Sequence, residues 1–249
     1  MIINLPEKIR SILYGNRSLY GTKIIKNDLD WIKWQKLYSE IYYENQKKGI
    51  GKIINNMGYN ILKDINFKNK TLLEIGIGSL PYLKKIGQSY KWFYAIDTNK
   101  EFLKLAKKNM SRCSTIHDRN GDMKNIPLKD NSIDIVLSFY SLEHIYNLDL
   151  KLKEFKRVLK KDGIIVGAIP TEGGTLWGLG RLLTTKPNVE SKGINYDKII
   201  CWEHPHFASE IILKLEKEFT RKKIIYNPFK FIKFLDLNLV YSFVYKCNK

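Results

Sequence analysis

The residues with the clearest chemical potential in this chain form a short glycine turn and an acid further along. The segment LLEIGIGS (72–79) reads as a buried strand that runs into Gly76 and Gly78. Glycines at that place let the backbone approach a ligand closely at the carboxyl edge of a parallel sheet. The next apolar run, WFYAID (92–97), ends in Asp97. An acid at the end of a second strand, about 20 residues beyond such glycines, can accept hydrogen bonds from ribose hydroxyls. The pattern therefore predicts a nucleoside-containing ligand.

Two further features indicate which nucleoside. Glu74 stands two residues before Gly76, where a carboxylate would repel a pyrophosphate and attract an ammonium group. The third glycine of a dinucleotide-binding turn is missing, because Leu80 and Pro81 follow instead. A ligand with a ribose, an amine and no phosphate is S-adenosylmethionine, which we expect as the cofactor.

The stretch from Leu72 to Ile169 resembles the class I S-adenosylmethionine-dependent methyltransferases of the broad small-molecule type. Such a resemblance implies an α/β, Rossmann-like fold, with a mostly parallel seven-stranded sheet, helices on both faces and an antiparallel last strand. The order and spacing of four segments carry it: LLEIGIGS, YAID, GDMKNIPLKDNSIDIVLSFYSLEHI (121–145) and EFKRVLKKDGIIVGAIP (154–170).

The resemblance also implies roles for individual residues around the cofactor. This chain departs from many relatives at Leu80-Pro81, where another glycine is common, so the turn should be stiffer. It implies no metal ligand. The implied cofactor-binding residues are Glu74, Gly76 and Gly78 at the methionine end, Asp97 and Thr98 at the ribose, Asp122 and Met123 at the adenine, and Ser138 and Phe139 beside the sulfonium.

Short apolar runs alternate with helical stretches from Thr71 onward, which predicts parallel strands covered by helices. After residue 170 the rhythm breaks, and we expect no regular element over 170–207. Aromatic and aliphatic residues recur at helical spacing over 28–44, which favours a stripe that packs on the next domain over part of a lid above a substrate pocket. The expected strands are 71–76, 92–97, 114–117, 133–139, 163–169, 222–229 and 237–246, and the expected helices are 28–44, 51–64, 80–87, 99–110, 148–160 and 209–218.

These elements predict a helical N-terminal extension over 1–70 and a methyltransferase domain over 71–249. The domain would carry a lid insertion at about 170–207, because a long segment without regular structure in a compact domain is usually functional. Trp177 and Trp202 in or beside that segment would suit an ordered lid over a sugar or another polyol. The layout of the segment also resembles methyltransferases of bacterial surface-polysaccharide assembly.

The acceptor is predicted to be a hydroxyl of a small molecule, such as a sugar or sugar nucleotide. The segment SFYSLEH (138–144) replaces the Asn/Asp-Pro-Pro-aromatic turn of enzymes that methylate exocyclic or amide nitrogens. None of the three cysteines is placed directly after strand four or strand five, where methylation at pyrimidine C5 would need a nucleophile. A hydroxyl must lose its proton, so a histidine near the methyl would help. His206 is the first candidate for that base, His144 the second and His204 the weaker third.

The composition leaves two alternative functions open. A formal net charge of +18 can mark a nucleic-acid surface, so an RNA methyltransferase is the first alternative. Lysine outnumbers arginine about five to one and the charge is spread along the chain, which favours a merely basic surface. The second alternative is a cofactor-binding partner module without catalysis, against which the presence of Glu74, Asp97 and Asp122 speaks. The oligomeric state stays open.

The sequence also predicts a cytoplasmic protein without a membrane span. No apolar run approaches the ~18 residues that cross a bilayer, and the N-terminal residues lack the features of a signal peptide. Cys113, Cys201 and Cys247 lie far apart, which indicates neither a disulfide framework nor a cysteine-rich zinc site.

Overall fold

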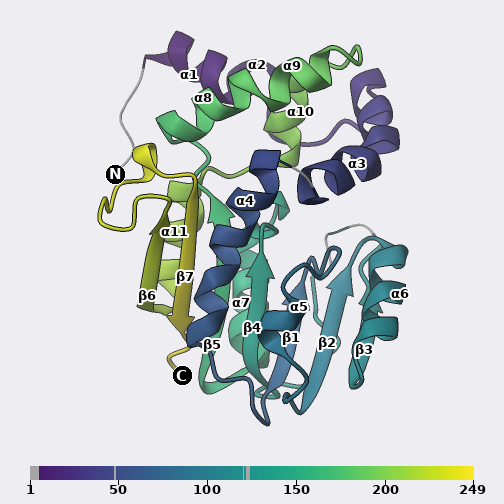
Figure 1. Cartoon of the computed structure of the whole chain (residues 1–249), viewed down its shortest axis with the longest axis vertical. Coiled ribbons are helices and arrows are strands. Elements are labelled where there is room, and N and C mark those ends of the chain that lie inside the picture. The colour runs from purple at the N-terminus through teal and green to yellow at the C-terminus, as the bar shows by residue number, and fades with distance from the viewer. Residues whose placement is uncertain (1–5, 48, 120, 122–123) are drawn as a thin grey trace. The chain divides into compact units, whose positions relative to one another are not determined.

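The computed structural model describes residues 6–47, 49–119, 121 and 124–249, and it describes no side chains from 39 to 50. The chain divides into two compact units (Figure 1). Unit 1 comprises residues 1–57, 170–210 and 226–241, and unit 2 comprises residues 58–169, 211–225 and 242–249.

A seven-stranded sheet forms the framework of unit 2 (Figure 1). Its strands follow the order β3-β2-β1-β4-β5-β7-β6, and the pairs from β3 to β5 are parallel. The final strands are antiparallel, so the predicted fold class is confirmed. The strands are β1 (Thr71–Ile75), β2 (Trp92–Asp97), β3 (Cys113–His117), β4 (Ile133–Phe139), β5 (Leu159–Pro170), β6 (Thr220–Asn227) and β7 (Val240–Lys246).

The strand order reverses between β1 and β4, which lie side by side although two strands separate them in sequence. In open parallel sheets, ligands bind outside the carboxyl ends of the strands at such a reversal. Leu72, Leu73 and Val136 on these strands are fully buried, because both faces of the sheet are covered. The apolar core thus fixes the strands whose carboxyl ends carry the candidate site.

The helices around the sheet follow the predicted rhythm, with one shortened element. The helix predicted over 80–87 is only α5 (Leu83–Ile86), because Leu80 has a left-handed φ of 58° and Pro81 follows. Asn99 caps α6 (Lys100–Asn109) by accepting a hydrogen bond from the Glu101 N–H at 2.9 Å. The other elements are α7 (Leu148–Val158), α11 (Ala208–Glu218), and the 3₁₀ helices η1 (Tyr59–Asp64) and η2 (Leu142–His144).

The prediction of no regular element over 170–207 was wrong. Three helices occupy the segment: α8 (Thr175–Leu183), α9 (Thr185–Glu190) and α10 (Tyr196–Glu203). One of the glycines that suggested a loop, Gly178, serves close packing instead. A Cβ on Gly178 would lie 2.7 Å from Cε1 of Tyr14, at the end of α1 (Glu7–Tyr14). The glycine lets α8 approach α1 closely within unit 1.

Unit 1 has its own aromatic core. α3 (Leu29–Lys47) presents Trp31 and Trp34 to a cluster that includes Trp202 of α10, so the stripe packs against the 170–207 segment within unit 1. Its other helices are α2 (Arg17–Tyr20), α4 (Gly49–Gly58), continued by η1, and a short 3₁₀ turn η3 (Leu235–Leu237). Among the residues described, no helix is both long and apolar enough to cross a bilayer.

We expect Gly167→Ala to disrupt the sheet. Gly167 of β5 pairs with Ser138 of β4, and an added Cβ would overlap the Ser138 carbonyl oxygen and lie 2.7 Å from Cζ of Phe243. Because backbone must shift, we expect a loss of about 3 kcal/mol or more, or failure to fold. The measurement is the free energy of unfolding in denaturant.

The matched control is Gly180→Ala in α8, where a new Cβ meets no atom within 4 Å. Alanine favours a helix over glycine by up to about 1 kcal/mol, so this variant should equal or exceed the wild type in stability. Equal losses in both variants would contradict the packing argument.

Candidate functional site

Left-handed backbone residues shape the turn that follows β1. Gly76 and Gly78 have φ angles of 72° and 55°, which glycine adopts at little cost. A Cβ on Gly76 would lie 2.7 Å from the Cβ of Ser141. Glycine is therefore needed at position 76 both for its conformation and for its space. The predicted glycine turn lies where the sheet order reverses.

Glu74 is a fully buried carboxylate at the centre of this turn's strand. It pairs in register with Ala95 of β2 and Leu137 of β4, so sheet lies on both sides of it. Neither carboxylate oxygen has a hydrogen-bond partner within normal geometry. Burial raises the pKa of Glu74 well above its ordinary value, the Tyr82 hydroxyl opposes that rise, and the negative charge of Asp97 adds to it. A cation beside the carboxylate would offset both the desolvation of its charge and the repulsion from Asp97.

Asp97 closes the same edge from the end of β2. Its carboxylate accepts hydrogen bonds from the Asn99 N–H at 2.7 Å and the Gly78 N–H at 3.2 Å. Burial raises the pKa of Asp97, and these backbone bonds oppose the rise. Asp97 therefore joins the two strand-end turns while keeping lone pairs for further donors. Thr98 beside it is exposed, and its carbonyl lies 3.0 Å from Nε2 of His117.

The end of β4 contributes a buried serine pair. Ser141 donates a hydrogen bond to the Ile75 carbonyl at 2.8 Å, and the Ser138 and Ser141 hydroxyl oxygens lie 2.6 Å apart. Since the Ser141 proton goes to Ile75, Ser138 donates to Ser141. The pair ties the β4 end to the β1 end. The sequence prediction included Ser138 and missed Ser141, which its place just after the strand could have suggested.

An aromatic group fills the space beside this serine pair. The Phe139 ring centroid lies 5.4 Å from that of Tyr82 and 5.2 Å from that of Tyr59. Tyr140 follows with a φ of 53°, and its N–H donates to the Ala168 carbonyl at 2.8 Å. A bulky residue in left-handed conformation is rare and often marks a functional turn. Tyr82 and Tyr140 lie at this strand end and were not among the residues predicted from the sequence.

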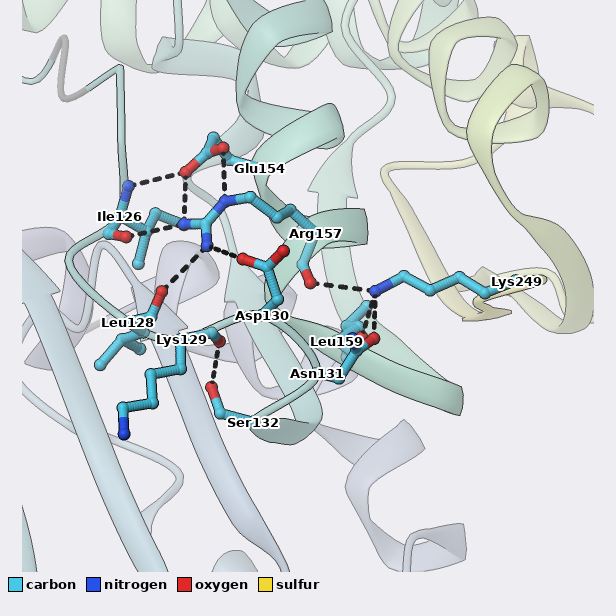
Figure 2. A network of polar contacts seen from close by, with 10 residues as sticks. All are labelled: Ile126, Leu128, Lys129, Asp130, Asn131, Ser132, Glu154, Arg157, Leu159 and Lys249. Carbon is cyan, nitrogen blue, oxygen red and sulfur yellow. Dashed lines mark hydrogen bonds and ion pairs between the residues drawn. The ribbon is translucent and has the colours of Figure 1, made fainter.

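Asp122 and Met123, the predicted adenine contacts, lie outside the described residues. The loop that follows them is firmly anchored. Arg157 of α7 bonds both oxygens of Glu154 and donates to Asp130, while Glu154 accepts from the Ile126 N–H at 2.8 Å (Figure 2). These bonds raise the pKa of Arg157 and lower that of Glu154. The same Arg157 donates to the carbonyls of Ile126 and Leu128.

The predicted catalytic histidines lie in different units. His144 ends η2 in unit 2 and is exposed. His206 belongs to unit 1, where its Nδ1 lies 3.6 Å from Oε2 of Glu210. Where these two histidines lie does not test whether either of them acts as a base. Both residues therefore remain predictions.

A histidine–carboxylate pair in unit 1 was not predicted. Nδ1 of His204 contacts Oε2 of Glu172, which is almost fully buried. Arg17 donates to the His204 carbonyl at 2.7 Å and lies 3.7 Å from the other Glu172 oxygen. Its guanidinium stacks 3.4 Å above the centre of the Phe207 ring. A buried carboxylate that orients an imidazole is the arrangement that activates a histidine base. No sequence signal links these residues, which are far apart in the chain.

The geometry above agrees with a comparison to protein families. Residues 73–167 match the family model described as a methyltransferase domain. The chain carries a class I S-adenosylmethionine-dependent methyltransferase domain. The matched segment contains the glycine turn, Asp97 and the whole of β4, and the cofactor of the domain is S-adenosylmethionine.

Among curated proteins, the chain is similar to the demethylmenaquinone methyltransferase of Staphylococcus haemolyticus. The two are 29% identical over 110 residues, which cover 43% of this chain and 46% of that protein. The chain thus spans about half the length of the curated relatives it matches.

Two solved structures share the fold. The N-methyltransferase NodS of Bradyrhizobium japonicum, bound to S-adenosyl-L-homocysteine, has a TM-score of 0.57 at 14% identity, over 87% of this chain and 98% of that one. The [4+2]-cyclase SpnF has a TM-score of 0.60 at 12% identity, over 86% and 93%. One is named for methyl transfer and the other for cyclisation, so the fold alone does not decide the reaction.

The residues at the sheet edge of unit 2 fit this cofactor. The unpartnered, buried Glu74 carboxylate matches the ammonium group of the methionine moiety, and Asp97 keeps acceptor capacity for ribose hydroxyls. The left-handed glycines allow close approach of a ligand to the backbone. Within the described part of the chain, no three histidine, cysteine or acidic side chains are grouped as a metal site would require.

We expect Glu74→Gln to stabilise the protein without cofactor and to weaken cofactor binding. The folded-state pKa of Glu74 lies above its ordinary value of 4.5, so the folded state binds more protons than the unfolded state between these two pKa values. Wild-type stability should therefore fall as pH rises through that window. The glutamine side chain carries no charge, so the melting temperature of the variant should exceed that of the wild type by a few degrees at neutral pH. This difference should vanish below about pH 4, where the wild-type carboxyl is protonated in both states.

Calorimetric titration with S-adenosylmethionine should show at least about tenfold weaker binding by Glu74→Gln, because a charge-assisted contact is lost. Glu101→Gln is the control, since Glu101 is an exposed side chain of α6. Unchanged cofactor affinity, or a lower melting temperature at neutral pH, would contradict the role of Glu74.

Proposed function

We propose that this protein transfers the methyl group of S-adenosylmethionine to a hydroxyl of a small molecule, such as a sugar or sugar nucleotide. The observation that carries the proposal is the buried Glu74 carboxylate without a partner, one strand away from Asp97. The cofactor supplies a methyl group on a positively charged sulfur, which a nucleophile attacks in line. The chain must then bind, orient and deprotonate the acceptor.

The binding part of the proposal rests on unit 2. Glu74 would pair with the ammonium group, and Gly76 and Gly78 would admit the methionine portion. Asp97 would hold the ribose hydroxyls, with Thr98 at their side. The remaining proposed contacts are Asp122 and Met123 at the adenine and Ser138 and Phe139 near the reacting methyl.

The acceptor proposal rests on sequence and on the relatives together. The stretch after β4 lacks the Asn/Asp-Pro-Pro-aromatic turn of many nitrogen methyltransferases. The substrate named for the staphylococcal relative, demethylmenaquinone, is a small molecule. RNA methylation stays the first alternative because of the net charge of +18, and a cofactor-binding module without catalysis stays the second. A link to polysaccharide assembly is part of this proposal.

Proton removal is assigned to a histidine. His206 and His144 are the candidates from the sequence, and the Glu172 contact makes His204 the strongest of the three. A carboxylate that holds Nδ1 fixes the ring and stabilises the imidazolium that forms when Nε2 takes a proton. Glu210 offers His206 a weaker version of the same support, since its side chain is 47% exposed.

The domain and location predictions also remain proposals. The helical segment 170–207 is proposed as a lid over the acceptor, and residues 1–70 as an N-terminal extension of the methyltransferase domain. A cytoplasmic location is supported by the free thiols of Cys113, Cys201 and Cys247.

The proposal predicts methyl transfer to hydroxylated small molecules. The full chain is incubated with S-adenosylmethionine carrying an isotope-labelled methyl group, against separate pools of sugar nucleotides, quinone precursors and RNA. Label should enter the sugar-nucleotide pool as an alkali-stable ether. Asp97→Asn should weaken cofactor binding by about tenfold or more, because each charge-assisted hydrogen bond contributes about 1.5–3 kcal/mol.

Asp64→Asn is the matched control, since Asp64 is an exposed acid in an ion pair with Lys223. It should bind the cofactor like the wild type. Label in RNA alone would replace the leading function by the first alternative. Cofactor binding without transfer to any pool would favour the non-catalytic module, and no binding at all would remove the cofactor assignment.

The three histidines make distinct kinetic predictions. Glutamine at the true base should lower turnover about 10²–10⁴-fold, with cofactor affinity unchanged. We expect the largest loss in His204→Gln, and a loss of similar direction in Glu172→Gln, because the orienting carboxylate is removed. His206→Gln and His144→Gln are each compared with the other variants as controls. The measurement is kcat of every variant across pH 5–9.

A base assignment requires that the acid limb of the pH–rate profile disappear in the same variant that loses turnover. If all three variants keep most of their turnover, alignment alone suffices and no histidine is the base. If His204→Gln merely unfolds, the melting temperature will show it, and Glu172→Gln decides the case.

A further inference from the structure

The loop between β6 and β7 exposes an unusual run of apolar and basic side chains. Its residues 229–234 read FKFIKF. Phe231 is 98% exposed, and Phe229 and Ile232 are exposed by 49% and 41%. Lys230 and Lys233 stand between them and are exposed too. The loop contains no acidic residue from 228 to 235, so its surface combines apolar and purely basic character.

This loop is held in place by a buried asparagine. Asn238 has no solvent exposure, and its Oδ1 accepts a hydrogen bond from the Phe229 N–H at 2.9 Å. Its Nδ2 donates to the carbonyls of Ile232 at 2.8 Å and Phe234 at 2.9 Å. The backbone around Phe231 is therefore fixed from both sides. An ordered loop that presents an aromatic ring to water indicates a contact surface.

Two helices of unit 1, α8 and α1, also expose apolar side chains, and hydrogen bonds link them to the segment that follows the loop. The Thr175 N–H and hydroxyl at the start of α8 both bond Asp236 of η3, which directly follows the loop. Arg181 of α8 donates to the carbonyls of Ile12 and Leu13 in α1. Loop, α8 and α1 are thus joined in one part of unit 1 (Figure 1).

These helices add exposed apolar residues at helical spacing. α1 exposes Ile9 and Ile12, which lie one turn apart, and α8 exposes Leu179 and Leu183. Lys8 and Arg10 flank Ile9 and are exposed as well. We call the exposed residues of the loop the apolar–basic surface; it consists of Phe229, Lys230, Phe231, Ile232 and Lys233.

We propose that the apolar–basic surface docks this protein on an anionic lipid membrane. Aromatic and aliphatic side chains that enter the boundary between headgroups and acyl chains, with lysines beside them, are the arrangement of peripheral membrane-binding segments. Each lysine or arginine near an anionic bilayer contributes about 1 kcal/mol of attraction. RNA fits less well, because the loop contains no arginine from 228 to 235, and arginine is the side chain best suited to recognise nucleic acids.

The docking test uses the full chain and two kinds of vesicle. One is pure phosphatidylcholine, and the other contains a third of phosphatidylglycerol. We expect binding to the anionic vesicles in a flotation assay, weakened by high salt, and little binding to the neutral ones. Absence of binding to anionic vesicles at low salt would overturn the proposal.

Matched variants separate this surface from the general positive charge. The double variant Phe231→Ser/Ile232→Ser and the double variant Lys230→Glu/Lys233→Glu should each lower the vesicle partition coefficient at least about tenfold. Leu213→Ser in α11 and Lys108→Glu in α6 are the controls, since both side chains are exposed outside the surface. Equal losses in the controls would overturn the proposal. Melting temperatures exclude unfolding as the cause.

Two other occupants give distinguishable outcomes. If the surface joins two copies of this chain, size-exclusion chromatography with light scattering will show a dimer that Phe231→Ser/Ile232→Ser dissociates. If it binds nucleic acid, RNA will be retained at low salt and lost in the lysine variant. Either result without vesicle binding overturns the membrane proposal.

Discussion

The candidate cofactor site depends on one unfavourable feature, a carboxylate buried without a partner. Glu74 lies in the middle of the parallel sheet, where desolvation disfavours its charge and Asp97 repels it. Folding offers only partial compensation, since neither carboxylate oxygen has a hydrogen-bond partner within normal geometry and the Tyr82 hydroxyl opposes the effect of burial only in part. Such an arrangement is stable only because the apolar strands around it contribute more than it costs, and a bound ammonium group would offset that cost.

The turns around Glu74 are held close together by hydrogen bonds and tight packing. Gly76 and Gly78 take left-handed conformations, and Ser141 packs so closely on Gly76 that no side chain fits there. The hydrogen bonds from Ser138 to Ser141 and from Ser141 to Ile75 join the ends of β4 and β1. Asp97 joins the β1 and β2 turns through the Gly78 N–H. Three strand ends are therefore positioned together, as a preorganised site requires.

Binding and reaction are separate questions for this fold. SpnF shares the architecture and is named as a cyclase, whereas NodS is named as an N-methyltransferase. The substrate that accepts the methyl group and the base that takes its proton must therefore be argued from side chains such as the Glu172–His204 pair. That pair arises from two segments of unit 1 that a sequence pattern cannot connect, because 32 residues separate them.

The sequence by itself determined the parallel sheet and the cofactor turn. The alternation of apolar runs with helical stretches specifies buried strands, and the spacing of Glu74, Gly76 and Asp97 follows from consecutive strand ends that meet at one edge. These features are local or follow from the order of the strands, so periodicity and turn chemistry suffice to predict them.

Only the tertiary structure decided the character of residues 170–207. Their glycines suggested a loop, yet Gly178 lies inside α8 because Tyr14 and Leu13 of α1 pack directly against it. Propensity disfavours glycine in a helix by about 1 kcal/mol, and close helix packing outweighs that preference. The tertiary structure also decided the contacts of Ser141, Tyr82 and Glu172, because each depends on a partner that only folding brings near.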